Sequence, residues 1–156
     1  MPECYAGIDP GYRQGGVALA QGSWSEVHDL PIFTEQGVDC VGLVDILRSV
    51  PISLCVIEKQ SSRPKQGVAS AFKIGMAYGQ ILSCLSVTKV PYRIVTPSKW
   101  KNAFNVPQDK DGARRLAQQL YPKQQQHLSR KKDEHRAEAL LMAAYAEGLA
   151  NAIQKM

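Results

Sequence analysis

Two carboxylates in this chain stand directly after short apolar segments. Asp9 ends the run that begins at Cys4, and Glu58 follows the nearly continuous apolar run 52–57. Such runs predict buried strands, and in open α/β sheets functional sites form beyond the carboxyl ends of parallel strands. Adjacent parallel strands would therefore bring Asp9 and Glu58 close together. The structural alternatives are a turn residue for Asp9 and a solvated strand end for Glu58.

A third group of candidates opens the last predicted helix. Glu138 is followed by an unbroken apolar run and is expected to lie close to the core. On a helix, Glu134 and His135 share a face with Glu138, four and three positions away. An acid such as Glu134 is also favoured by the helix dipole, which is its structural alternative. Asp133 points elsewhere, and its place at the helix start favours a capping role.

Carboxylates gathered at one place repel one another unless a cation joins them. Oxygen-rich ligand sets suit Mg²⁺ or Mn²⁺. Two such ions about 4 Å apart can clamp a phosphodiester, activating a water on one side and stabilising the leaving oxygen on the other. Asp9, Glu58, Glu138 and Glu134 are therefore the candidate metal ligands, and these acids together with His135 are the candidate catalytic residues.

Charge is unevenly distributed along the chain. The formal net charge is +5, but residues 58–136 hold 16 Lys and Arg against 5 Asp and Glu, whereas residues 1–57 hold 2 against 7. Such asymmetry indicates a polyanionic partner, most commonly nucleic acid, although a surface charged for solubility is the alternative. Basic residues that hold a phosphate backbone, beside acids that hold a metal, fit phosphodiester cleavage.

Size and composition narrow the class of protein. A chain of 156 residues with 44% hydrophobic residues is expected to form one domain, 1–156, which excludes a large two-domain enzyme and a disordered tail. The N-terminus shows no targeting pattern, and the longest uncharged run, 74–88, is too short to span a bilayer. The four cysteines have apolar neighbours and no C-x-x-C pairing, so a reducing, cytoplasmic setting is expected.

The elements that must position these residues alternate in type. Apolar runs predict strands at residues 4–9, 15–21, 24–30, 52–57 and 92–96. Helical patterns cover residues 38–47, 68–87, 109–120 and 133–154, a further helix begins at Pro97, and 121–132 is loop or frayed helix. This layout predicts an α/β fold, with a hairpin-led mixed sheet and helices on its faces. Its parallel strands would end at Asp9, Glu58 and Thr96.

Several short blocks resemble one known family. They are Gly7-Ile8-Asp9-Pro10-Gly11, Gly15-Gly16-Val17-Ala18-Leu19, Val56-Ile57-Glu58 and Arg136-Ala137-Glu138-Ala139-Leu140-Leu141. With the segments 70–79 and 95–101, these blocks make the chain similar to the RuvC-type Holliday-junction resolvases, and most of all to small phage and prophage members. The resemblance runs from about residue 4 to residue 147.

The resemblance implies a ribonuclease H-like fold with a five-stranded mixed sheet. It implies a homodimer joined through the helix containing 70–79, which nicks four-way DNA junctions symmetrically with Mg²⁺ or Mn²⁺ in recombination and repair. It also implies four active-site positions, three of which are Asp9, Glu58 and Glu138. The fourth is an acid or histidine three or four residues before Glu138, so His135 and Glu134 both qualify. Asp133 would qualify if the helix began later or unwound there.

Two departures from the family bear on the mechanism. The family usually has Asp at the position of Glu138, so the longer side chain changes the reach of this ligand. Bacterial relatives carry an aromatic wedge after the glutamate, whereas the loop 59–63 has none, and phosphate contacts would replace it. The candidate DNA contacts are Arg13, Arg63, Lys65, Gln66, Lys73, Lys99, Lys101 and Arg114, with Lys110 and Arg115 of the same kind. Trp100 and Phe104, four residues apart, are interpreted as a core stripe.

Three functions compete for this pattern. The first is a metal-dependent, structure-selective DNA endonuclease that acts as a dimer on branched DNA, in the cytoplasm of a bacterial or phage-infected cell. The second is a non-catalytic or less selective binder of branched DNA, which would have lost one or more of the acids; all are present. The third, a phosphate loop of the sugar-kinase or actin type, requires two such domains and exceeds 156 residues.

Overall fold

Five strands form one mixed sheet in the computed structural model, which describes residues 2–156. The strands, in the order in which they lie side by side, are β3 (Trp24–Asp29), β2 (Gly16–Gln21), β1 (Cys4–Asp9), β6 (Ile52–Glu58) and β7 (Tyr92–Val95). The first three pair antiparallel, and β1, β6 and β7 pair parallel. The α/β fold with a five-stranded mixed sheet, as expected from the sequence, is confirmed.

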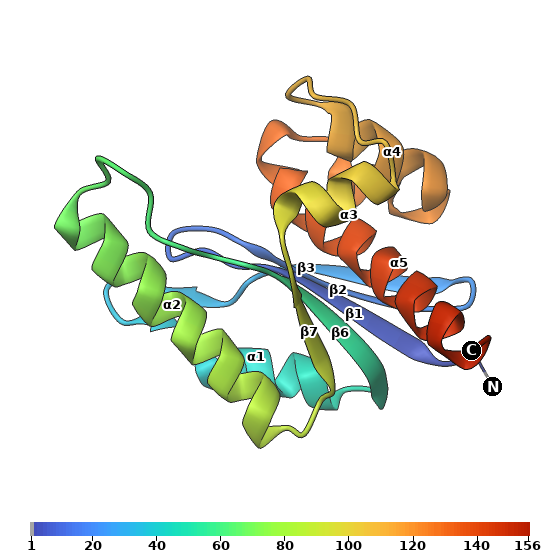
Figure 1. Cartoon of the computed structure of the whole chain (residues 1–156), viewed down its shortest axis with the longest axis horizontal. Helices are drawn as coiled ribbons and strands as arrows, with labels where there is room; N and C mark the ends of the chain where they lie inside the picture. Colours follow the sequence, from blue (N-terminus) through green and yellow to red (C-terminus); the bar gives the residue numbers. More distant parts are fainter. Residues whose placement is uncertain (1) are drawn as a thin grey trace.

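Helices cover both faces of the sheet (Figure 1). One face carries α1 (Cys40–Arg48) and α2 (Val68–Val87), and the other carries α3 (Pro97–Ala103), α4 (Gly112–Leu120) and α5 (Glu134–Gln154). Two short 3₁₀ helices, η1 (Pro122–Leu128) and η2 (Lys131–Asp133), connect α4 to α5. A two-stranded hairpin, β4 (Ile32–Phe33) with β5 (Gly37–Val38), precedes α1.

Alternation along the central strand divides the core in two. In β1, Tyr5 packs toward α5, whereas Ala6 and Ile8 pack toward α1 and α2. All six residues of β1 are buried, as expected for a strand covered on both faces. The functional residues of β1 and β6 therefore lie only where these strands end.

Two glycines let α5 lie directly on the sheet. A Cβ on Gly7 would stand 2.0 Å from the backbone oxygen of Ala139, and one on Gly16 would stand 2.2 Å from that of His135. Both distances are far inside van der Waals contact, so only glycine fits at either strand position. The glycines of the two N-terminal blocks thus set how closely the first turns of α5 approach β1 and β2.

Most boundaries agree with the sequence expectation within two residues, and the larger differences lie in three places. The fourth predicted helix begins at Gly112 rather than at residue 109, and the segment 121–132 forms two 3₁₀ helices. The β4–β5 hairpin was not expected, because two-residue strands are too short to show a period in the sequence.

α2 presents an apolar outer face. Val68, Phe72 and Val87 are largely exposed, while Ala77 and Ile81 pack against the sheet. Among the described residues, α2 alone has the length and hydropathy of a membrane-spanning helix. One helix of this kind is weak evidence for a membrane, since core helices of water-soluble proteins have the same character.

Candidate functional site

The site forms where β1, β6 and α5 meet. Parallel pairing places Ile8 opposite Ile57, so Asp9 and Glu58, the next residues, leave the sheet side by side. α5 begins at Glu134 above the same edge, and its close approach carries His135 and Glu138 toward Asp9. The three segments identified from the sequence are therefore brought together at one end of the sheet.

Asp9 and His135 make the closest contact in the site. The Oδ2 atom of Asp9 lies 2.6 Å from Nδ1 of His135, across 126 positions of sequence. Asp9 is 5% exposed, and an ionised carboxylate can only accept, so Nδ1 is the donor in this bond. The hydrogen bond and the charge of Asp9 raise the pKa of His135 and favour its cationic form.

Glu58 is held by one residue that follows β7. The indole Nε1–H of Trp100 donates to Oε2 of Glu58 over 2.9 Å, and the Trp100 side chain is completely buried. Burial and the nearby charge of Asp9 raise the pKa of Glu58, and the hydrogen bond from Trp100 opposes that shift.

Glu138 is largely buried among like charges. Burial and the charges of Asp9, Glu58 and Glu134 raise the pKa of Glu138 to about 8, against the opposing effect of Lys101. The Nζ atom of Lys101 lies 3.6 Å from Oε1 of Glu138, a single and partly exposed counter-charge. At neutral pH burial and the neighbouring acids therefore favour the protonated form of Glu138 in the metal-free site.

Glu134 stands at the edge of this group. It lies one helical turn before Glu138, and both side chains line a cavity of about 390 Å³ that also contains Lys101 and Lys110. Glu134 therefore faces open space beside the site, while His135 contacts Asp9 directly. Both residues remain candidates for the fourth position, in different roles.

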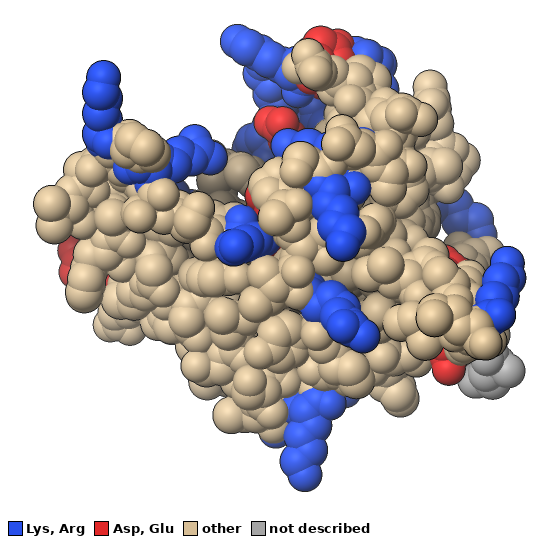
Figure 2. Space-filling model, viewed as in Figure 1, with Lys and Arg blue, Asp and Glu red and all other residues tan. Residues whose placement is uncertain are grey.

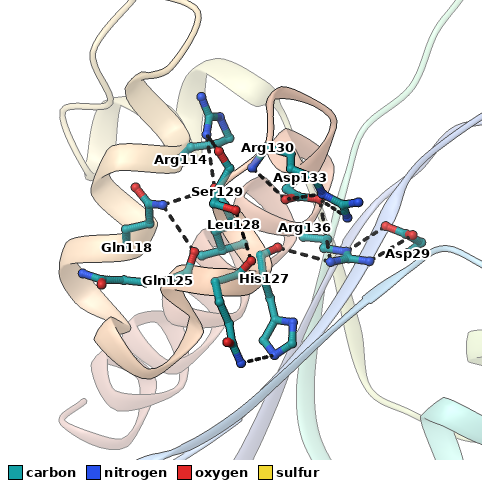
Figure 3. A network of polar contacts seen from close by, with 11 residues as sticks. Asp29, Arg114, Gln118, Gln125, His127, Leu128, Ser129, Arg130, Asp133 and Arg136 are labelled. Atoms are coloured by element: carbon teal, nitrogen blue, oxygen red, sulfur yellow. Dashed lines mark hydrogen bonds and ion pairs between the residues drawn. The ribbon is translucent and has the colours of Figure 1, made fainter.

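Asp133 belongs to a separate network (Figure 3). Its carboxylate accepts from the backbone N–H, Nε and Nη2 of Arg130 at 2.9, 3.2 and 3.0 Å, and Arg136 approaches within 3.7 Å. Its side chain does not cap α5, and it does not point into the site. The alternative that Asp133 completes the site is not supported, because its charge is already neutralised by arginine.

The candidate DNA contacts border the site on several sides. Arg63 and Gln66 line a cavity of about 550 Å³ with Glu58, and Arg13 shares one cavity with Lys73 and another with His135. Lys65 and Lys99 are exposed, and Lys101 lies within the site. Basic side chains dominate the charged surface in Figure 2 and border the hollow between the loop before α2 and the lobe of α3 and α4.

Arg114, which is expected from the sequence to contact DNA, makes hydrogen bonds within the chain. Its guanidinium donates to the backbone oxygens of Leu128 and Ser129 and to Asp111, at 3.2, 3.0 and 2.6 Å (Figure 3). The side chain is mostly buried, so α4 is tied to η1 through this residue. Arg115 is likewise paired, with Asp109. Positive charge in the sequence does not reveal such internal pairing.

The donor set fits a divalent cation. Asp9, Glu58 and Glu138 offer oxygen ligands at one sheet edge, and burial together with their mutual repulsion raises the pKa values of the two glutamates, which a bound cation would offset. As they stand, no three acidic, His or Cys side chains within residues 2–156 converge tightly enough to define a metal site. The fit therefore rests on ligand chemistry and charge.

Sequence reasoning missed two residues that touch the candidate acids. Trp100 was interpreted as core, which is correct for its ring, but its polar edge meets Glu58. Lys101 was expected to contact DNA, and its nearest charged partner is Glu138. Their place in the sequence could have indicated this, because both lie in the helix that begins at Pro97, just after β7, and β7 ends beside the candidate site.

Comparison with known proteins identifies the fold. No protein-family model and no curated protein sequence matches the chain. Among solved structures, it is similar to T. thermophilus RuvC in complex with Holliday junction substrate, with a TM-score of 0.70, 19% identity and 96% of both chains covered. A second Thermus thermophilus RuvC structure gives a TM-score of 0.65 with 20% identity, again over 96% of both chains. The yeast mitochondrial Holliday junction resolvase Ydc2 gives 0.58 with 14% identity, over 96% of this chain and 82% of that one. At these identities the likeness establishes that the chain shares the fold of these structures.

Proposed function

We propose that this protein is a metal-dependent DNA endonuclease that resolves four-way junctions by paired symmetric nicks. The observation that carries the proposal is the meeting of Asp9, Glu58, Glu138 and His135 at one sheet edge, on a fold shared with a protein solved with Holliday junction substrate. The basic segment 58–136 adds positive surface around this acidic centre.

Each residue has a definite task in this reaction. Asp9, Glu58, Glu138 and Glu134 would hold Mg²⁺ or Mn²⁺, with two ions in each site. Bound ions supply Lewis acidity, which activates a water and stabilises the leaving oxygen. The contact with Asp9 fixes the ring of His135, so Nε2 is left to accept or give a proton.

Basic residues hold the substrate. Arg63 and Gln66 lie on the Glu58 side of the site, and Arg13 and Lys73 lie on the His135 side. These side chains would contact phosphates of a strand that crosses the carboxylates, without reading sequence. The protein would work in the cytoplasm of a bacterial or phage-infected cell.

We further propose that α2 joins two subunits. Val68, Phe72 and Val87 form an exposed apolar face, and Gly75 and Gly79 have no described atom within 4 Å of a Cβ position. Small residues on an apolar face permit close backbone approach by a second copy. The variant Phe72→Glu is expected to shift the light-scattering mass from dimer to monomer and to uncouple the two nicks. A monomeric wild type at high concentration would exclude the paired mechanism.

The principal test is cleavage of labelled four-way junction, linear duplex and flap DNA with Mg²⁺ or Mn²⁺. Wild type should nick the junction in symmetric pairs, and Asp9→Asn and Glu58→Gln should lower the rate by at least about a thousandfold. Asp45→Asn, an exposed acid on α1, is the matched control and should cleave at the wild-type rate. If no substrate is cut, or the site variants cut normally, the protein is not this enzyme.

A less selective action on branched DNA is the second candidate. The observation that favours it is the loop 59–63, which carries no aromatic side chain that could stack in an opened junction. Equal cleavage of flap and junction in the same assay would support this candidate over the junction resolvase. Binding to all branched substrates without cleavage would support a non-catalytic protein.

A further inference from the structure

One buried tryptophan meets the candidate site with its only polar atom. Trp100 has no exposed surface, and its ring packs in the core beneath α4 and α5. Its Nε1–H donates to Oε2 of Glu58 over 2.9 Å. An indole N–H is a donor only, and a buried one requires a partner, so the carboxylate satisfies it.

The geometry of this pair is set by backbone. Glu58 ends β6 opposite Val95 of β7, and the backbone N–H of the following residue donates to the oxygen of Val95 at 2.8 Å. α3 begins at Pro97, two positions beyond Val95, so Trp100 lies one helical turn from the same strand end. The two side chains thus extend from adjoining strands that are hydrogen-bonded to each other.

The contact restricts the Glu58 carboxylate. Within residues 2–156, Trp100 is the one side chain that donates a hydrogen bond to Glu58. The bond occupies one lone pair of Oε2 and restrains the carboxylate, and within residues 2–156 no side chain donates to Oε1. Rotating the carboxylate away would leave a buried indole N–H without an acceptor, which is unfavourable.

We propose that Trp100 is a positioning residue for Glu58, which holds this carboxylate in the orientation in which it receives a divalent cation. The proposal rests on the proposed function, since Glu58 must be a metal ligand for its orientation to matter. Partners of metal-binding carboxylates orient them and raise the affinity of the site, which gives the contact a measurable consequence.

The first experiment removes the donor and keeps an aromatic ring. Trp100→Phe is expected to weaken Mg²⁺ binding by about tenfold in calorimetry of the full-length protein. It should lower kcat on the junction by a similar factor and leave KM unchanged, since Trp100 contacts no substrate. Trp24→Phe, at the partly exposed start of β3, is the matched control and should bind Mg²⁺ like wild type. A folded Trp100→Phe variant with wild-type affinity would overturn the proposal.

The second experiment leaves Trp100 in place. In wild type, the indole N–H resonance of Trp100 is expected to shift on addition of Mg²⁺, while that of Trp24 stays fixed. In Glu58→Gln the Trp100 resonance should start from a different position and should lose most of its response to Mg²⁺. A Trp100 resonance that ignores both changes would overturn the proposal, even if Trp100→Phe failed to fold.

These outcomes distinguish a failure of the proposed function from a failure of the positioning role of Trp100. A wild-type protein that binds no Mg²⁺ in calorimetry contradicts the proposed function and this inference together. A wild type that binds Mg²⁺, with a folded Trp100→Phe variant that binds equally well, contradicts the positioning role alone.

Discussion

Asp133 and Glu138 lie five positions apart at the start of α5, and both carboxyl groups are largely buried. Arg130 and Arg136 surround Asp133, and burial, which opposes ionisation, is outweighed by the hydrogen bonds and charge of Arg130, so its pKa lies below the usual value. Asp9 and Glu58 lie near Glu138, and burial with their charges raises its pKa to about 8. The two regions bury the same chemical group in opposite surroundings.

This contrast separates a structural acid from a functional one. The charge of Asp133 is neutralised inside the chain, and it fastens η2 to α5 (Figure 3). Burial and like charges disfavour the charged form of Glu138, and only Lys101 partly offsets them among the described residues. Burial alone does not mark a site, whereas a buried carboxylate facing other carboxylates does.

The largest expected effect tests the functional side of the contrast. Glu138→Gln should reduce junction cleavage by at least about a thousandfold, since it removes a metal ligand. The same change relieves like-charge repulsion, so the melting temperature of the metal-free protein at pH 8 should rise. Activity and differential scanning calorimetry measure the two effects. A Glu138→Gln variant that is less stable than wild type and still active would show that Glu138, like Asp133, is a structural acid.

The next effect tests the structural side. Asp133→Asn should lower the free energy of unfolding by about 2 kcal/mol, because it weakens charge-assisted hydrogen bonds to Arg130. Cleavage per folded molecule should stay within a few-fold of wild type. Urea unfolding gives the stability, with the exposed acid variant Asp45→Asn as control. Unchanged stability with abolished cleavage would return Asp133 to the site.

Stability should depend on pH in opposite directions for the two acids. The folded pKa of Glu138 is raised, so its stabilising contribution is present at low pH and is lost as pH rises toward and through about 8. The folded pKa of Asp133 is lowered, so its contribution is present above the unfolded value and is lost as pH falls through the folded one. Unfolding of metal-free wild type, Glu138→Gln and Asp133→Asn from pH 3 to 9 separates the windows. Parallel curves for the two variants would contradict the assignment.

Metal binding should depend on the protonation of Glu138. Below about pH 8 Glu138 must release a proton to bind Mg²⁺, so affinity should rise with pH, approaching about tenfold per unit. Calorimetry at pH 7 in buffers of different ionisation enthalpy should show net proton release. The release should disappear in Glu138→Gln and persist in Asp133→Asn.

The smallest effect lies at the outer edge of the arginine network. Asp29 pairs with Arg136 at 2.8 and 3.1 Å, but its side chain is 70% exposed. Asp29→Asn should therefore cost no more than about 1 kcal/mol of stability, and less at high salt. Chemical unfolding at two salt concentrations measures this. A larger loss would mean that Arg136, rather than Asp133, organises the network.

The positions of the candidate acids could be predicted from the sequence, because they depend on local hydrophobic patterns. The strands that end at Asp9 and Glu58 are continuous apolar runs, and the apolar run after Glu138 marks a helix lying on the core. Each acid therefore lies where an apolar segment of the sequence begins or ends. Where parallel strands end together, such boundaries converge in space.

The remaining part depends on partners distant in the sequence. His135 meets Asp9 across 126 positions, and Trp100 meets Glu58 across 42. Nothing in the residues around Arg114 shows that its guanidinium binds backbone oxygens of η1. The helical spacing of Trp100 and Phe104 predicts burial but carries no information about which way an indole edge points.

The contact of α5 with Gly7 and Gly16 has a consequence for the lifetime of the site. Because the backbone of α5 packs directly on the backbone of β1 and β2 there, α5 cannot move away from the sheet without opening the hydrophobic core between them. Amide hydrogens of β1 and of α5 around Ala139 and Ala143 should then exchange with solvent only through global unfolding. The acids would remain aligned for as long as the chain is folded, and local fluctuations would be confined to the rim formed by α3, α4 and the loop before α2.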